Sequence, residues 1–274
     1  MTYLNGLWTK WMPAHAPDVA VDGKPRLSGI MDTINASDAH GPETRLPAEF
    51  YDEKARAYAD KMAVEEWYSG YIESSEYRRL GIGALLGDVV DNMVKTAAMA
   101  GWYSGSVTSS PTEQGQKAIR FALSGCHDTT VAGILCAVGA FENGKWPPFT
   151  SSVAIELFSK ADDDKQRGLF SSLFNKRPAH SARIPLDSLP ESVRRDLQRH
   201  YVRIRYNDQP VRIPGCAAKP ENHLPGDDTF CTLDAFKAIV DKFTPKNWGA
   251  ECMKNLGEGP FGKDDRYKEI SGYY

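Results

Sequence analysis

His127 and Asp128 are adjacent side chains whose types and setting suit chemistry on a phosphate group. They follow the stretch IRFAL, residues 119–123, whose apolar residues alternate as in a strand. The apolar stretch that opens at Thr129 is typical of a helix. A helix N-terminus carries partial positive charge and free amide groups, and sites in α/β sheets form beyond the carboxyl ends of strands. The pair therefore lies where a phosphate site is expected.

The same two residues also have a purely structural interpretation. Asp128 would cap the helix that follows, and His127 would be an ordinary loop histidine. Spacing alone favours this structural interpretation over a catalytic one. The surrounding sequence therefore has to decide between them.

The surrounding residues resemble the histidine acid phosphatases, the acid branch of the histidine phosphatase (phosphoglycerate mutase-like) superfamily, in their fungal-type form. The string S-G-C-H-D-T-T-V-A-G at 124–133 is similar to the second motif of that family. The resemblance extends over most of residues 25–255. It is carried by Trp67–Tyr68, Arg79–Leu80–Gly81, Gly83, Pro147–Pro148–Phe149, Ile155–Glu156–Leu157–Phe158, Val202–Tyr206, Ile213–Cys216, Cys231–Leu233, Trp248 and Cys252.

The resemblance implies an α/β fold, a phosphoglycerate mutase-like three-layer αβα domain with a central, mostly parallel sheet and a helical cap. We expect residues 1–274 to form one such domain, and we expect it to be incomplete. Its expected parts are a helical cap at 48–100, a sheet core at 115–215 with an insertion at 161–190, C-terminal helices at 216–255 and a tail at 256–274.

Periodicity in the chain predicts the individual elements. Residues 1–48, which are rich in turns, are expected to be partly irregular, and the aromatic residues of 48–71 are expected in a core. The pattern predicts helices over 48–71, 80–99, 191–199 and 232–243, a strand over 151–160, and a hairpin over 201–213 that turns at Asn207–Asp208.

The first motif of the family, R-H-G-x-R-x-P, does not occur in the sequence. In the family its histidine is the nucleophile and its arginines bind the phosphate. The string A-H-G-P-E-T-R-L-P at 39–47 lacks the leading arginine and the preceding strand, so we interpret it as a chance similarity. Arg199–His200–Tyr201 lacks the glycine and leads into a strand. The chain therefore resembles the C-terminal two thirds of a histidine acid phosphatase.

The resemblance also implies a mechanism and roles for the pair. A family histidine attacks phosphorus and forms a phosphohistidine, while arginines hold the phosphoryl oxygens. His127 would bind the same oxygens, and Asp128 would protonate the leaving alcohol and then accept a proton from water. The implied substrates are phosphate monoesters, and neither a metal nor a cofactor is required.

Three hypotheses about activity follow, and enzymatic activity of the chain alone stays open. In the first, the chain is an incomplete acid phosphatase with little or no activity by itself. In the second, it has lost catalysis and binds a phosphate ligand or a protein partner. In the third, it works through an unrecognised nucleophile. The missing motif favours the first hypothesis.

Cysteines and one sequon bear on the compartment. The family usually closes the region between Cys216 and Cys231 with a disulfide, whereas Cys252 resembles a cysteine whose partner lies in the N-terminal half. Asn35 begins an N-A-S glycosylation sequon. The resemblance implies a secreted or vacuolar (lysosomal) protein, and it allows a homodimer. The first residues lack a signal-peptide pattern, so a cytoplasmic product is the alternative.

Composition excludes other classes of protein. The formal net charge of −3 gives no basic footprint for nucleic acid. No apolar run approaches the length of about 18 residues that a membrane span needs. The cysteine and histidine spacings do not match a zinc site, so no metal is expected.

Overall fold

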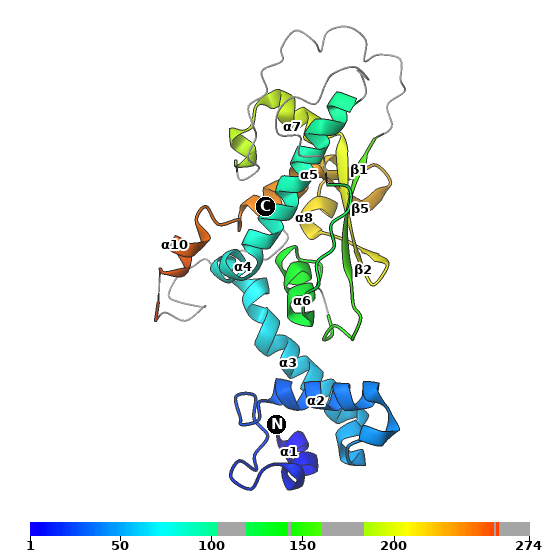
Figure 1. The fold of residues 1–274 in the computed structure, drawn as a ribbon, viewed down its shortest axis with the longest axis vertical. Coiled ribbons are helices and arrows are strands. Elements are labelled where there is room, and N and C mark those ends of the chain that lie inside the picture. Colours follow the sequence, from blue (N-terminus) through cyan, green and yellow to red (C-terminus); the bar gives the residue numbers. More distant parts are fainter. Residues whose placement is uncertain (104–118, 142–143, 161–183, 255, 258–274) are drawn as a thin grey trace. The chain divides into compact units, whose positions relative to one another are not determined.

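The structure is a computed structural model that describes residues 1–103, 119–141, 144–160, 184–254 and 256–257 (Figure 1). The chain divides into two compact units. The first comprises Met1–Ser69 with Asn143–Pro148, and the second comprises Gly70–Glu142 with Phe149–Tyr274. Most of the expected insertion at 161–190, and almost all of the tail, lies outside the described residues.

Helices build the first unit around a small apolar core. Its elements are α1 (Thr2–Trp8), η1 (Thr9–Trp11), α2 (Leu27–His40), η2 (Pro42–Thr44), η3 (Ala48–Tyr51) and the first part of α3 (Glu53–Glu73). The Trp8 ring stacks on Phe50 with ring centroids 5.6 Å apart, and the Trp8 indole donates to the Glu49 carbonyl at 2.9 Å. Leu27, Ile30 and Ile34 follow helical spacing and are buried in the same core.

The expectation of a partly irregular start is confirmed for residues 12–26, which form turns and irregular backbone. The flanking α1 and the 14-residue α2 are regular helices that bury their apolar faces against η3 and α3. The expectation that the aromatic residues of 48–71 lie in a core is confirmed for Phe50 and Tyr68, which are buried. It is wrong for Tyr58 and Trp67, since each is about 40% exposed. Small residues fill the core-facing side of α3 instead, including Ala55, Ala59 and Ala63.

An antiparallel sheet organises the second unit. Its strands are β1 (Val153–Ser159), β2 (His200–Tyr206), β3 (Gln209–Val211), β4 (His223–Leu224) and β5 (Asp227–Thr232), and the strand order is β1-β2-β5-β4 with β3 beside β2. Every described pairing is antiparallel, which corrects the expected mostly parallel sheet. The mixture of helices with a sheet confirms the predicted α/β class.

Helices cover the apolar face of this sheet. Val202 and Ile204 of β2 are fully buried, and α9 (Leu233–Asp241) contacts β2 and β5. In turn α5 (Ala84–Tyr103) packs on α9. Gly83, just before α5, and Gly87 within it lie against Phe243 and Thr244, which follow α9. A Cβ atom on Gly83 would lie 2.0 Å from the carbonyl oxygen of Phe243, so only glycine fits there.

The remaining helical elements are α4 (Ser75–Arg78), the π-helical turn η4 (Arg79–Gly83), α6 (Asp128–Ala137), η5 (Leu186–Ser188), α7 (Glu191–Leu197), α8 (Pro214–Ala217), η6 (Pro220–Asn222) and α10 (Trp248–Cys252).

The predicted helices near 48–71, 80–99, 191–199 and 232–243, the strand at 151–160 and the hairpin are all confirmed within a few residues. Asn207 and Asp208 have φ values of 46° and 66°, as a two-residue hairpin turn requires. The predicted strand at 119–123 is wrong, because a strand needs a neighbour for its backbone groups. Among the described residues no strand pairs with this stretch.

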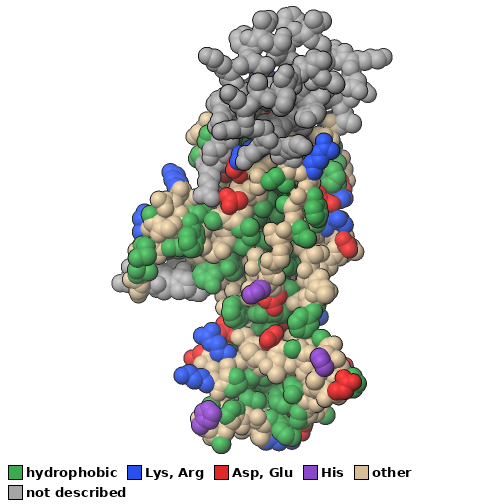
Figure 2. Space-filling view, in the orientation of Figure 1, with side chains coloured by type: hydrophobic (Ala, Val, Ile, Leu, Met, Phe, Trp, Pro, Cys, Tyr) green, Lys and Arg blue, Asp and Glu red, His purple; other side chains and the backbone are tan. Residues whose placement is uncertain are grey.

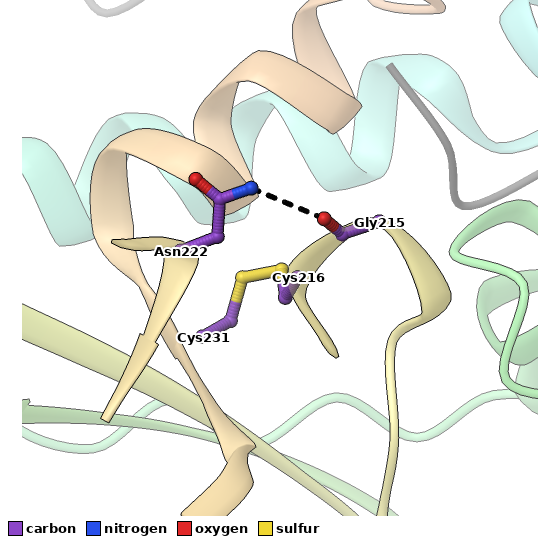
Figure 3. Close-up of a disulfide and its surroundings, with 4 residues drawn as sticks. All are labelled: Gly215, Cys216, Asn222 and Cys231. Atoms are coloured by element: carbon purple, nitrogen blue, oxygen red, sulfur yellow. Dashed lines mark hydrogen bonds between the residues drawn. A yellow bond between two sulfur atoms is a disulfide. The ribbon is translucent and has the colours of Figure 1, made fainter. Parts of the chain in front are cut away.

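A disulfide joins Cys216 of α8 to Cys231 of β5, with Cα atoms 5.3 Å apart (Figure 3). Both cysteines are buried. Asn222 donates a hydrogen bond from its side-chain amide to the Gly215 carbonyl at 3.2 Å. This bond is a second link between the loop that joins the two cysteines and α8. No helix of the described residues is long and apolar enough to cross a membrane.

Candidate active site

Helix α6 fixes the positions of His127 and Asp128. Its buried residues, from Val131 to Ala137, anchor the helix in the second unit, whereas its first turn is half-buried. His127 precedes the helix with extended backbone angles, φ −92° and ψ 163°, and its side chain is exposed. Asp128 is the first helical residue and is half-buried. The pair therefore lies at the accessible end of a helix whose other residues are mostly buried.

Hydrogen bonds inside the first turn already engage some of the amide groups that could bind a phosphate. The Thr130 amide donates to the His127 carbonyl at 3.0 Å, and the Val131 amide donates to the same oxygen at 3.1 Å. The Thr129 amide donates to Asp128 Oδ1 at 2.7 Å. An anion at this helix end would consequently depend on the His127 side chain and on the helix dipole more than on free amides.

These contacts modify the structural interpretation of Asp128 as a helix cap. The N-cap residue is His127, and Asp128 comes one position later. The Asp128 carboxylate nevertheless accepts a hydrogen bond from the Thr129 amide, so it satisfies one amide of the first turn, as a capping side chain does.

A glycine contact places α6 against the end of α3. A Cβ atom on Gly133 would lie 3.4 Å from the ring of Tyr71, and one on Gly81 would lie 2.8 Å from it. The Tyr71 ring therefore lies between α6 and η4, and its close approach to η4 depends on glycine at position 81, whereas the distance at Gly133 is an ordinary van der Waals contact. Burial raises the pKa of Tyr71 above its usual value. The contact of Tyr71 with Gly133 could not be read from sequence spacing, because it joins separate elements.

The two other histidines that stand beside phosphatase-like strings lie in unsuitable places. His40 is the last residue of α2, and its Nδ1 lies 3.3 Å from the Thr44 hydroxyl. His200 is buried at the start of β2, where its Nδ1 lies 2.8 Å from the Asp196 carbonyl oxygen. Neither histidine follows a strand: His40 ends a helix, and His200 begins one of the strands.

Cysteine and asparagine candidates fall into different environments. The predicted disulfide of Cys216 and Cys231 is present, and Cys252 is free. Cys136 is buried, and burial raises the pKa of its thiol, whereas Cys126 is exposed. Asn35 lies within α2, where its side-chain oxygen accepts from Arg56 at 3.2 Å.

Sequence reasoning missed a charged cluster on the sheet. Glu156 of β1 accepts Arg203 Nε at 2.9 Å, and its Oε1 accepts Arg205 Nη2 at 3.1 Å. The Arg203 guanidinium also lies over the rings of Phe158 and Phe230, 5.1 and 4.8 Å from their centroids. Only the register of β1 on β2 brings these residues together, and the sequence does not state that register.

Comparison with known proteins identifies the family. The model of the histidine phosphatase superfamily (branch 2) matches residues 34–207. A probable acid phosphatase of Schizosaccharomyces pombe is 34% identical over 244 residues, which are 86% of this chain and 49% of that protein. Prostatic acid phosphatase of Rattus norvegicus is 24% identical over 190 residues, 67% of this chain and 33% of that protein. The chain thus spans half or less of the length of these curated relatives. Since the family model covers well over half of the chain, the chain belongs to the histidine phosphatase superfamily, branch 2.

Proposed function

We propose that this chain carries the His127–Asp128 half of a site that hydrolyses phosphate monoesters. The observation that supports the proposal is the S-G-C-H-D-T-T string at the start of α6, in a chain that belongs to the histidine phosphatase superfamily. Two curated relatives are named as acid phosphatases, which supports the same reaction class.

The proposed reaction has two steps. A histidine nitrogen attacks phosphorus, the bond from phosphorus to the leaving oxygen breaks, and Asp128 gives its proton to that oxygen. Asp128 then takes a proton from water, the water oxygen attacks the phosphohistidine, and inorganic phosphate leaves. His127 stabilises the phosphoryl oxygens while charge moves onto them. Because Asp128 must be protonated for the first step, the reaction suits acid conditions.

The nucleophile of this proposal is a histidine that the 274 residues do not supply in an R-H-G-x-R-x-P motif. The proposal therefore assigns the chain one half of the machinery. Secretion or a vacuolar location is proposed with it, because the disulfide of Cys216 and Cys231 suits an oxidising compartment. A homodimer of the intact family member remains part of the proposal.

A fusion protein tests the roles of the pair directly. The R-H-G-x-R-x-P segment of an active family member is fused to the N-terminus of the chain, and hydrolysis of p-nitrophenyl phosphate is measured at acid pH. We expect Asp128→Asn to lower kcat by about a hundredfold or more, as loss of a general acid does. Asp32→Asn is the matched control, since Asp32 is an exposed helical carboxylate. Equal activity of the Asp128→Asn and Asp32→Asn fusions would overturn the assignment.

One observation favours a second function, the binding of a phosphate ligand without hydrolysis. The first motif is absent from the sequence, while the second is intact. Inorganic phosphate should then stabilise the chain against thermal unfolding, and His127→Ala should abolish that shift. If phosphate shifts the melting temperature of the two proteins equally, His127 does not bind it.

A further inference from the structure

Tyr71, near the end of α3, contacts three other elements of the second unit. Hydrophobic side chains, a class that includes tyrosine in Figure 2, reach the surface of the molecule in several places. Exposure therefore does not distinguish the half-buried Tyr71, whereas its contacts do. Its ring meets the Tyr77 ring of α4 edge to face, with centroids 4.8 Å apart. The same ring lies against η4 at Gly81 and against α6 at Gly133.

Arg78 holds the backbone from which this ring projects. Its Nη1 donates to the Tyr71 carbonyl at 3.0 Å and to the Ile72 carbonyl at 2.9 Å. Both carbonyls belong to the last turn of α3, where the helix itself supplies no donor. Arg78 is only 4% exposed, and hydrogen bonds from a charged donor are among the stronger ones. The end of α3 is therefore fixed from inside the unit.

The turn η4 is fixed as well, by the C-terminal part of the chain. Trp248 Nε1 of α10 donates to the Leu80 carbonyl at 2.8 Å. Gly83, at the end of η4, lies directly against the Phe243 carbonyl. Short π-helical turns of this kind occur frequently at functional sites. On its η4 side, the Tyr71 ring thus meets an element that is held at two further points.

Helix α6 packs on this arrangement. Among the described helices and strands, η4 is its main neighbour. Gly133 meets the Tyr71 ring, and Cys136 lies three residues later on the same face of α6. Burial contributes most to the raised pKa of Tyr71, followed by Tyr77 and then by the Cys136 thiol, so Cys136 also lies near the ring. The ring consequently sets the distance between α6 and η4.

We propose that Tyr71 is a positioning residue for Asp128. The inference rests on the function proposed above, in which Asp128 gives a proton to the leaving oxygen. Asp128 is the first residue of α6 and Gly133 is the sixth, so a displacement of the helix at Gly133 also moves the carboxyl group. A general acid must lie within hydrogen-bond reach of the atom that it protonates. A misplacement of about 1 Å can cost about a hundredfold in rate.

The fusion protein described above gives the first test, through the dependence of the rate on the leaving group. We expect Tyr71→Ala to lower kcat/KM about tenfold or more for phenyl phosphate, whose leaving oxygen needs a proton. For p-nitrophenyl phosphate the loss should be less than about threefold, because its leaving oxygen is a much weaker base. Tyr71→Phe keeps the ring and should behave as the unchanged fusion.

Gly87→Ala is the matched control for this test. Its Cβ would lie 2.7 Å from the Thr244 side chain, so the substitution strains the same unit at a contact that does not involve α6. It should not change the ratio of the two kcat/KM values. A loss in Tyr71→Ala that is equal for the two esters would indicate a structural role alone and would overturn the proposal.

Substitutions of Gly133 test the contact from α6. A Cβ atom there would lie at an ordinary 3.4 Å from the Tyr71 ring, so Gly133→Ala should leave the ratio of kcat/KM values unchanged. Gly133→Leu needs the space of the ring and should displace α6. In a fusion that already carries Tyr71→Ala, Gly133→Leu should cost less than it does alone. Fully additive losses would show that the two residues do not act through one contact, which contradicts the proposal.

Hydrogen exchange of the 274-residue chain gives a measurement that is independent of catalysis. The Thr130 and Val131 amides donate to the His127 carbonyl in the first turn of α6. Tyr71→Ala should speed their exchange about tenfold or more and leave the amides of β2 unchanged. If neither the exchange nor the ratio of kcat/KM values changes, the inference fails even where Asp128→Asn inactivates the fusion. If Asp128→Asn leaves the fusion active, the proposed function fails, and faster exchange then still supports the role of Tyr71 in placing α6.

Discussion

Lys237 and Asp241 form an ion pair within one turn of α9, with Lys237 Nζ 2.8 Å from Asp241 Oδ1. Lys237 is fully buried, and the second oxygen of Asp241 accepts the Leu186 amide at 2.9 Å. The pair therefore fastens η5 to α9. Burial raises the pKa of Asp241 despite the attraction of Lys237, which lowers it.

Replacement of Lys237 by methionine should destabilise the second unit by about 3 kcal/mol at neutral pH, because it leaves the half-buried carboxylate of Asp241 without its cation. Without Lys237 the pKa of Asp241 rises further. A carboxyl with a raised pKa costs stability when it is charged, so the loss should shrink as the pH falls toward its usual value of 3.8. Urea unfolding at several pH values measures this. A loss of unfolding free energy that does not change with pH would contradict this expectation. So would an equal loss when Lys237→Met is made in a chain that already carries Asp241→Asn.

Glu156 should show the opposite dependence on pH. Burial raises its pKa, but hydrogen bonds from Arg203 and Arg205 outweigh burial and hold the pKa below the usual 4.5. Glu156→Gln should therefore cost about 1–2 kcal/mol near pH 7, and the cost should fall as the pH drops below 4.5. Glu191→Gln is the control, since Glu191 is 64% exposed and its ion pairs are on the surface. A similar loss in both variants would indicate that the network on the sheet contributes nothing special.

The disulfide should contribute measurably to stability. It closes a loop with a sequence separation of 15, for which loop entropy suggests about 3 kcal/mol. The variant with both Cys216→Ser and Cys231→Ser should lose about that much free energy of unfolding. Cys252→Ser, which removes a free cysteine, should change it by less than about 0.5 kcal/mol. If a reducing agent does not change the free energy of unfolding of the original chain, the disulfide does not form.

Gly83→Ala tests the close approach of η4 to the end of α9. The added Cβ would meet the backbone oxygen of Phe243 at 2.0 Å, and a backbone atom cannot turn aside as a side chain can. We expect a loss of about 2 kcal/mol or more. Gly249→Ala in the same unit is the control, because its Cβ would meet Asn247 at an ordinary 3.8 Å. If Gly83→Ala leaves the free energy of unfolding unchanged, η4 can move away from Phe243 without loss of stability.

The sequence predicted those elements whose own residues hold the signal. The helix of 80–99, the helix of 232–243 and the Asn207–Asp208 hairpin each have a local period or a turn pair, and each is present. The strand at 119–123 has an equally good local pattern but no described neighbour, so alternation alone did not produce it. Strand formation depends on partners distant in sequence, which a local pattern cannot supply.

The candidate site divides in the same way. Adjacent residues such as His127 and Asp128 could be placed at a helix start from the sequence, because one local element positions both. The use of the Thr129 and Thr130 amides within that turn could not be predicted, since it depends on side-chain and backbone geometry. The contact of Tyr71 with Gly133 and the cluster around Glu156 join separate elements, so they required the fold.

The 274-residue chain by itself should hydrolyse p-nitrophenyl phosphate at close to the uncatalysed rate. Catalysis by this family chemistry requires a histidine nucleophile, and the two histidines with similar flanking residues are unsuitable. His40 ends α2, and His200 is buried against the Asp196 carbonyl. In the proposed mechanism His127 binds phosphate and Asp128 donates a proton, and neither forms the phosphohistidine, so we expect at least about a thousandfold less activity than in the active fusion. Hydrolysis is measured at acid pH for the chain and for Asp128→Ala. Robust turnover by the chain that disappears in Asp128→Ala would show that another of its residues attacks phosphorus.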